Sequence, residues 1–144
     1  MPRSSCPFCD IASGSATAAV VFEDELSLAF LDQRPLFPGH TLLVPREHIE
    51  TLPELPSSAL QTFFANAQLL CRAVESAMNA EGSFVAVNNR VSQSVPHLHV
   101  HIVPRRKKDG LRGFFWPRSK YEDEHQIAAV QASIRQAASR LTGL

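Results

Sequence analysis

One segment of the chain alternates strictly between histidine and aliphatic residues. The histidines are His97, His99 and His101, and the aliphatic residues between and after them are Leu98, Val100 and Ile102. Because side chains on a β-strand point to opposite faces with a period of two, a strand over residues 97–103 gathers the three imidazoles on one face. A helix would scatter them. The pattern therefore predicts a strand with a histidine-lined face, and Pro96 suits its first position, where no ladder N–H is needed.

Other short runs of apolar and β-branched residues predict four further strands. They lie at residues 19–23, 26–31, 40–44 and 83–87. Asp24 and Glu25 separate the first two runs and predict a hairpin between them.

Two segments have the three- and four-residue spacing of amphipathic helices. The first covers residues 60–78, is preceded by a capping box at 58–61, and is predicted to end near Gly82. The second follows the acidic residues 122–124 near the end of the chain. Its apolar side consists of Ile127, Val130, Ile134, Ala138 and Leu141.

Composition favours one soluble domain over residues 1–144. The chain is 44% hydrophobic, which is enough for a core, and its 14 basic and 14 acidic residues give a net charge of +0. This balance argues against nucleic-acid and membrane-surface partners. There is no apolar leader or membrane-length run, and three cysteines do not make a disulfide framework, so we expect a cytoplasmic protein.

Positive charge is concentrated directly after the histidine segment. Half of the basic side chains lie there, namely Arg105, Arg106, Lys107, Lys108, Arg112, Arg118 and Lys120. Such a run either attracts an anionic ligand to the site or forms a solvated loop. The aromatic segment Phe114, Phe115 and Trp116 then either lines the mouth of a site or packs on the sheet.

Two cysteines near the start of the chain predict half of a structural zinc site. Cys6 and Cys9 are separated by two residues, and no strand or helix pattern surrounds them, which argues against a redox CxxC motif. Tetrahedral zinc needs two more ligands from the six histidines, which are His40, His48, His97, His99, His101 and His125. The alternative is a pair of unligated surface thiols.

These motifs together resemble the histidine triad (HIT) superfamily of nucleotide-binding hydrolases and transferases. The similar segments are Cys6-Pro7-Phe8-Cys9, Ala29-Phe30-Leu31-Asp32, Pro38-Gly39-His40, Pro45-Arg46-Glu47-His48 and Gln93-Ser94-Val95-Pro96 ahead of the triad. The resemblance implies an α+β fold, with a five-stranded antiparallel sheet, a long central helix and a C-terminal helix. It also implies a homodimer whose sheets join edge to edge.

The resemblance assigns the reacting groups. His99 matches the nucleophile that attacks the α-phosphate, and a neutral imidazole can do so when its other nitrogen donates to a fixed acceptor. His101 matches the residue on the phosphate and leaving-group side. His40 matches a buried histidine that supports the triad.

The resemblance also assigns the substrate contacts. Ser94 and Gln93 match donors to phosphate, and Asn88 matches a further polar contact, although its neighbour Asn89 is an alternative. Asp32 matches the acid that binds the ribose hydroxyls. The base slot is expected to be apolar, with candidates Phe8, Phe22, Leu31 and Phe37.

Zinc-containing members imply a closed structural site made of Cys6, Cys9, His48 and His97. The loop at 88–93 looks shorter than in many relatives, and Ser92 stands where glycine often lies. The helix after Trp116 replaces the short tail of the nucleoside-phosphoramidase branch, so the chain resembles a bacterial, zinc-containing member of the fragile-histidine-triad branch, whose members cleave dinucleoside polyphosphates. A nucleoside phosphoramidase, a zinc-dependent hydrolase using His97 and His99, and a non-catalytic nucleotide-binding module are the alternatives.

Overall fold

The computed structural model describes residues 6–111 and 118–142. The segment Phe114–Trp116 lies outside the described residues. The chain separates into two compact units, Met1–Asp109 and Gly110–Leu144. The first contains the sheet and the second contains the last helix, so a single domain over 1–144 stays a prediction.

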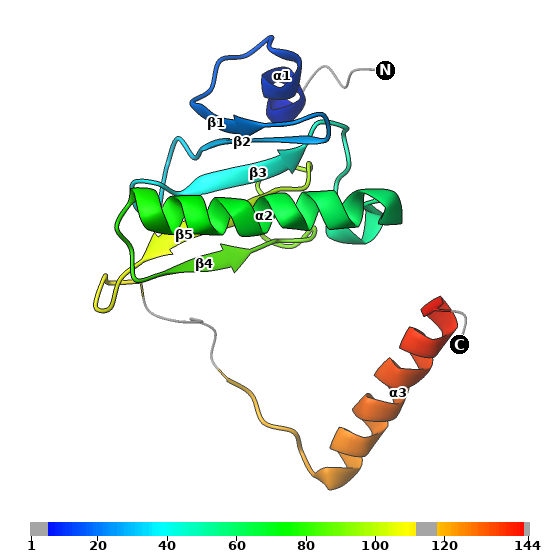
Figure 1. Ribbon diagram of the computed structural model, residues 1–144. Coiled ribbons are helices and arrows are strands. Elements are labelled where there is room, and N and C mark those ends of the chain that lie inside the picture. Colours follow the sequence, from blue (N-terminus) through cyan, green and yellow to red (C-terminus); the bar gives the residue numbers. More distant parts are fainter. Residues whose placement is uncertain (1–5, 112–117, 143–144) are drawn as a thin grey trace. The chain divides into compact units, whose positions relative to one another are not determined.

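Five strands form one antiparallel sheet in the order β1-β2-β3-β5-β4 (Figure 1). They are β1 Val20–Glu23, β2 Ser27–Leu31, β3 Thr41–Pro45, β4 Gly82–Ala86 and β5 Val100–Arg105. This sheet confirms the predicted α+β class. Because β5 lies between β3 and β4, His101 is on an interior strand, opposite Leu42 of β3 and Ala86 of β4.

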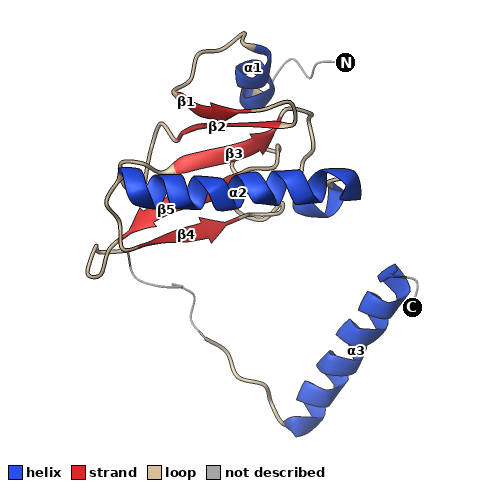
Figure 2. Ribbon diagram, in the orientation of Figure 1, coloured by secondary structure: helices blue, strands red, loops and turns tan. Residues whose placement is uncertain are grey.

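The long helix α2, Ser57–Ala77, packs on one face of the sheet (Figures 1 and 2). Its buried Phe63, Ala67, Leu70 and Val74 share a core cluster with the three aliphatic residues of the histidine segment. The predicted alternation of faces is therefore confirmed. The prediction of a capping box at 58–61 is wrong, because the helix begins at Ser57 after Pro56 and has no side-chain hydrogen bond at its cap.

A short helix, α1 Pro7–Ser13, packs on the opposite face of the sheet. Phe8 belongs to a second cluster with Phe30 and Leu42, which alternate along β2 and β3 with residues of the first cluster. The expectation that no helix surrounds the two cysteines is wrong. Cys6 caps this helix by accepting the Cys9 N–H at 3.4 Å, and seven residues are too few for a visible helical period.

The histidine strand begins three residues later than predicted, at Val100. The N–H of His97 bonds to the carbonyl oxygen of Val95 in a turn, and the N–H of Leu98 bonds to that of Ile49. These bonds take the place of the sheet ladder before Val100.

The remaining elements are a 3₁₀ turn, η1 Leu52–Glu54, and the last helix, α3 Glu124–Thr142. The last helix was predicted correctly, and the carboxylate of Asp123 accepts the N–H of Gln126 in its first turn. Within residues 6–111 and 118–142 there is no helix with the length and hydrophobicity needed to cross a bilayer.

Candidate active site

A cavity of about 600 Å³ opens on the histidine face of the sheet. Its apolar wall is built by α1, β2, β3 and the segment before β1, and includes Pro7, Phe8, Ile11, Ala18, Phe30 and Leu42. Its polar wall includes Asp32, Gln33, Arg34, Ser94, His99 and His101. A concave apolar site with a few convergent polar groups is typical of small-molecule binding.

His99 is held in one tautomer by the backbone. Its side chain is almost fully buried, and its Nδ1 lies 2.8 Å from the carbonyl oxygen of His97. A carbonyl oxygen only accepts, so Nδ1 carries the proton of the neutral ring and Nε2 keeps its lone pair. The ring of Phe8 packs edge-to-face against that of His99, with centroids 5.2 Å apart.

His40 and His101 form a directed hydrogen-bond chain. The N–H of Leu36 donates to His40 Nδ1 at 3.0 Å, so the neutral His40 ring carries its proton on Nε2. That Nε2–H donates to His101 Nδ1, also at 3.0 Å. His101, which lines the cavity, is therefore left with a proton on Nε2 as a hydrogen-bond donor.

Burial keeps both of these rings neutral. Desolvation, together with the neighbouring His99 and His40, lowers the pKa of His101 to about 4, although Asp32 opposes the shift. Desolvation also lowers the pKa of His40, again against the effect of Asp32. The chain from Leu36 to His101 therefore persists at neutral pH.

Asp32 lines the cavity where β2 ends. One carboxylate oxygen accepts the N–H of Arg34 at 2.9 Å, and the other lies 3.6 Å from His40 Nε2. Asp32, His40 and His101 bring three potential ligand atoms within 4.8 Å of one another. A metal there would need a lone pair on His40 Nε2, but the Leu36 N–H fixes the proton at that nitrogen, so the tautomer disfavours a cation.

The four predicted zinc ligands do come together. Cys6, Cys9, His48 and His97 place one donor atom each within 4.8 Å of the others. Sulfur–nitrogen separations are 3.2 Å for Cys9–His48, 3.4 Å for Cys6–His97 and 3.5 Å for Cys9–His97. A tetrahedral zinc ion separates such donors by about 3.3 to 3.8 Å, so the residues fit this metal.

The histidines of this cluster have their lone pairs available for a metal. His97 Nε2 donates to the carbonyl oxygen of Pro45 at 2.8 Å, which leaves Nδ1 unprotonated toward the two thiols. Burial lowers the pKa of His97 and favours the neutral ring. His48 Nδ1 faces Cys9, while its buried Nε2 lies 3.8 Å from the carboxylate of Glu50.

Two predicted substrate contacts lie outside the cavity lining. The Gln93 side chain donates to the carbonyl oxygen of Glu50 and accepts the N–H of Arg90, both at 2.7 Å. Asn89 accepts the N–H of Leu52 at 2.9 Å, whereas the Asn88 side chain makes no hydrogen bond to any other described residue. Ser94 does line the cavity.

The apolar wall was only partly predicted. Phe8 and Leu31 line the cavity as expected, but Phe22 and Phe37 do not. Pro7 and Ile11 were missed because α1 was not predicted, although the three-residue spacing of Phe8 and Ile11 is helical. Arg34, the one lysine or arginine among the described residues that line the cavity, was also missed.

The fold and the site define a triad protein, with alternating histidines beside a cavity and a Cys₂His₂ cluster against the same segment. The sequence profile of the HIT domain matches residues 13–108, and the chain belongs to this family.

Several curated relatives are similar to the chain. The protein hit of Bacillus subtilis is 34% identical over 139 residues, which are 95% of this chain and 94% of that protein. An adenylylsulfatase of Arabidopsis thaliana is 33% identical over 76% of this chain and 56% of its own length. A bis(5'-nucleosyl)-tetraphosphatase of Schizosaccharomyces pombe is 35% identical over 62% of this chain. The chain thus spans only about half the length of these two enzymes.

Solved structures share the fold. The crystal structure of a HIT family protein from Bacillus subtilis has a TM-score of 0.84 and 32% identity, and covers 92% of this chain and 96% of that one. The structure of a zinc-bound histidine triad protein from Mycobacterium smegmatis has a TM-score of 0.70 and 35% identity, and covers 94% of this chain and 97% of that one.

Proposed function

We propose that the protein is a nucleotidyl hydrolase or transferase that cleaves nucleotide conjugates at the α-phosphate through a covalent intermediate on His99. The observation that carries this proposal is the bond from His99 Nδ1–H to the His97 carbonyl oxygen. It leaves the Nε2 lone pair on a ring that lines the cavity. An imidazole in this tautomer attacks phosphorus without first losing a proton.

In the first step, His99 Nε2 forms a bond to the α-phosphorus and the phosphorus–oxygen bond to the leaving group breaks. The electron pair of that bond stays with the leaving group. In the second step, water attacks the same phosphorus, the phosphorus–nitrogen bond breaks, and the nucleoside monophosphate is released. The electron pair of that bond returns to His99 Nε2, which restores the neutral ring, and the attacking water releases a proton to the solvent.

His101 is proposed to donate from Nε2 to a phosphate or leaving-group oxygen. The chain Leu36–His40–His101 supports this role, because it fixes the proton on the nitrogen that is not used by His40. The low pKa of His101 keeps the ring a neutral donor at physiological pH. Ser94 is proposed as a second donor to phosphate from the same wall of the cavity.

The nucleoside is proposed to lie against α1 and β2. Asp32 presents a carboxylate that can accept bonds from two ribose hydroxyls. The apolar wall around Phe8 and Phe30 suits the flat face of a base. Direct phosphate contacts from Gln93 and Asn88 remain proposals carried by the family resemblance.

Among conjugates, a dinucleoside polyphosphate is the proposed substrate class. The fission yeast relative named as a bis(5'-nucleosyl)-tetraphosphatase supports this choice, and the Arabidopsis adenylylsulfatase supports cleavage of nucleotide conjugates more generally. A nucleoside phosphoramidate is the second candidate, because the same attack at phosphorus cleaves it.

The cluster of Cys6, Cys9, His48 and His97 is proposed to hold a structural zinc ion. Four protein donors complete a tetrahedral site, so a zinc ion would link α1 to the segment that carries His97 and His99. The zinc-bound relative from Mycobacterium smegmatis supports this choice. A zinc-dependent hydrolase using His97 and His99 is disfavoured, because His97 Nδ1 already faces the thiols.

We further propose a cytoplasmic homodimer. β4 lies at one end of the described sheet, and an end strand is where a second copy of the chain could continue the sheet. A non-catalytic nucleotide-binding module would use the same cavity and differs only in lacking turnover.

Turnover and adduct formation test the proposal together. The wild type and His99→Asn are incubated with dinucleoside polyphosphates and phosphoramidates, and the products and the intact protein are analysed by mass spectrometry. We expect a nucleotide adduct on His99 in the wild type and a loss of turnover of several powers of ten in the variant. His125→Asn, in α3, is the matched control. Undiminished hydrolysis by His99→Asn would exclude the covalent route.

A further inference from the structure

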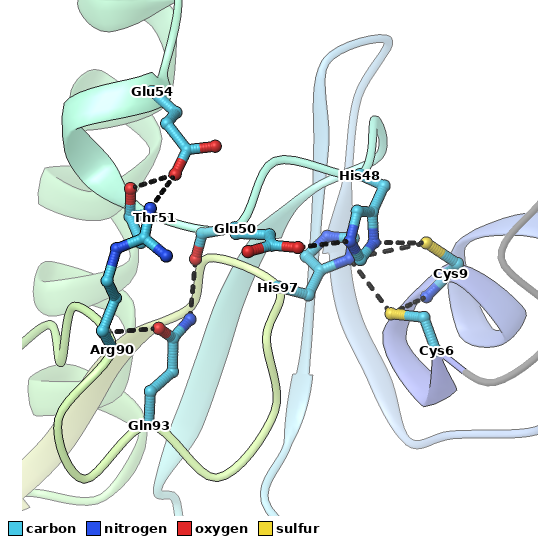
Figure 3. A network of polar contacts seen from close by, with 9 residues as sticks. All are labelled: Cys6, Cys9, His48, Glu50, Thr51, Glu54, Arg90, Gln93 and His97. Atoms are coloured by element: carbon cyan, nitrogen blue, oxygen red, sulfur yellow. Dashed lines mark hydrogen bonds and ion pairs between the residues drawn. The ribbon is translucent and has the colours of Figure 1, made fainter.

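The four proposed zinc ligands, Cys6, Cys9, His48 and His97, come from three segments, two of which also build the cavity. Cys6 caps α1 and Cys9 lies in it, and Phe8 of the same helix lines the apolar wall. His97 precedes the nucleophile by two residues. His48 follows β3, in the segment that leads to η1. Figure 3 shows these ligands beside a second group of polar residues, which extends away from the cluster toward Arg90 and Gln93.

Glu50 touches both groups. Its carboxylate lies 3.8 Å from His48 Nε2, on the ring whose other nitrogen faces Cys9. A neutral histidine that binds a metal through Nδ1 carries its proton on Nε2, so the carboxylate is placed to orient that ring. The carbonyl oxygen of the same residue accepts the Gln93 amide at 2.7 Å.

Gln93 uses both ends of its side chain within the protein. While its Nε2 donates to Glu50, its Oε1 accepts the N–H of Arg90 at 2.7 Å. The side chain thus joins the metal-holding segment to the loop that ends at Ser94, a residue of the cavity wall. Figure 3 shows the amide between the two backbones.

The same loop has two further attachments to η1 and its flanks. Asn89 accepts the Leu52 N–H at 2.9 Å, and Arg90 pairs with Glu54 at 2.9 Å. Arg90 and Ser92 have φ values of 68° and 61°, in the left-handed region that side chains other than glycine avoid. Such a loop keeps its conformation only where neighbouring contacts hold it.

We propose that Gln93 is a positioning residue that couples metal binding to nucleotide binding. A bound metal would fix the His48 ring and, with it, the Glu50 carboxylate beside that ring. Because the Glu50 carbonyl oxygen accepts the Gln93 amide, Gln93 then holds the loop that carries Ser94 in place. Metal binding thereby determines the conformation of the loop on the side of the cavity where phosphate is proposed to bind. This inference rests on the proposed nucleotide site, and it differs from a direct phosphate contact by Gln93.

Coupling of this kind is reciprocal. If zinc raises the affinity for a nucleotide by some factor, the nucleotide raises the affinity for zinc by the same factor, typically 5-fold to 150-fold in allosteric proteins. A direct contact between Gln93 and phosphate behaves differently. Its loss would weaken nucleotide binding by a similar factor in the metal-loaded and metal-free protein, and would leave the coupling factor unchanged.

The experiment measures zinc affinity by chelator competition with and without saturating AMP, and AMP affinity of the loaded protein by calorimetry. The variants are Gln93→Ala, Gln93→Glu, which keeps an acceptor for Arg90 but loses the donor to Glu50, and Gln136→Ala on α3 as control. We expect AMP to raise zinc affinity at least about 5-fold in the wild type and the control. In both Gln93 variants the factor should fall close to one.

A second measurement needs no variant. Hydrogen exchange of the amides at 89–95 is compared between the zinc-loaded and metal-free wild type, with the β1–β2 hairpin as internal reference. The loop should gain more protection from zinc than the hairpin does. Equal protection, or a coupling factor that survives Gln93→Ala, would overturn the inference. Failure of AMP to bind the loaded protein would overturn the proposed function as well, whereas binding without coupling overturns this inference alone.

Discussion

The carbonyl oxygen of His97 accepts the Nδ1–H of His99 at 2.8 Å, while the His97 ring faces the thiols of Cys6 and Cys9. His97 therefore joins the proposed zinc site, through its side chain, to the His99 ring, through its main chain. Any change that displaces the His97 backbone also displaces the acceptor that sets the tautomer of His99.

Metal removal should loosen the fold rather than only stop the chemistry. A structural ion that links α1 to the sheet contributes several kcal/mol, so its loss lowers the melting temperature by on the order of 10 °C in a domain of this size. Calorimetry before and after chelation, with metal analysis, measures this. Cys9→Ser should mimic chelation, while Cys71→Ser should not. An unchanged melting temperature with lost turnover would instead indicate a catalytic metal.

Phe8→Ala should weaken both the fold and nucleotide binding. Phe8 is 8% exposed, packs on the rings of Phe30 and His99, and lines the cavity. Truncating a buried phenylalanine costs about 3–5 kcal/mol, and Phe8→Leu, which keeps most of the volume, should cost less. Urea unfolding and AMP calorimetry report the two effects. AMP binding that is equal in the wild type and both variants would contradict the assigned base slot.

Stability should fall between neutral pH and about pH 4 because of the neutral site histidines. The pKa of His101 is lowered from 6.5 to about 4 by burial, so the unfolded chain binds a proton in this window that the folded chain does not. The neutral His101 ring makes its full contribution to the free energy of unfolding above about pH 6.5. This contribution is lost as the pH falls from 6.5 to about 4. Unfolding free energies measured from pH 7 to pH 4.5 should show a smaller decline in His101→Gln, with His125→Gln as the control. An identical decline in both variants would refute the assignment.

Asn66→Ala should destabilise the β1–β2 hairpin. The buried Asn66 amide donates to Asp24 at 2.7 Å and to the hydroxyl of Ser27 at 2.9 Å, and so ties α2 to this turn. A hydrogen bond to a charged group contributes about 1.5–3 kcal/mol, and its loss leaves a carboxylate oxygen without its partner. Chemical denaturation measures the change, with Gln68→Ala, an exposed position on the same helix, as comparison. Equal stabilities for the two variants would contradict this role.

Ser92→Gly should leave the protein equally stable or stabilise it by up to about 1 kcal/mol. Ser92 has a φ of 61°, where a side chain costs about 1–2 kcal/mol, while glycine gives back part of this gain through its greater freedom in the unfolded chain. The same substitution at Ser139, inside α3, should destabilise by about 0.5–1 kcal/mol. Denaturant melts of both variants test the contrast, and a large loss at Ser92 would show that its side chain is required.

Long patterns made much of the fold predictable. The spacing over 60–78 identified α2, and the alternation from His97 to Ile102 assigned two faces that the structure confirms. α1 was missed because its seven residues offer only one helical spacing, that of Phe8 and Ile11. The start of β5 was also missed, since it depends on where Leu98 finds its partner, the carbonyl oxygen of Ile49.

The site was predictable in its residue types but not in its proton positions. The choice of His48 and His97 as ligands came from the family resemblance. The spacing of the two cysteines alone does not say which two of the six histidines complete the zinc site. The tautomers of His40 and His97 depend on Leu36 and Pro45, whose backbone groups meet these rings only after folding. Patterns in the sequence do not predict such hydrogen bonds between a ring and a distant backbone group.

The ligands of the proposed zinc site are 91 positions apart at their extremes, Cys6 and His97. On a ribosome that adds about 5–20 residues per second, both thiols emerge some 5–20 s before the last imidazole. During that interval the nascent chain carries both cysteines but lacks the histidine that completes the proposed site. All four donors are present only once β1 to β4 have been synthesised, so zinc binding at the proposed site would require that the chain as far as His97 has already been made.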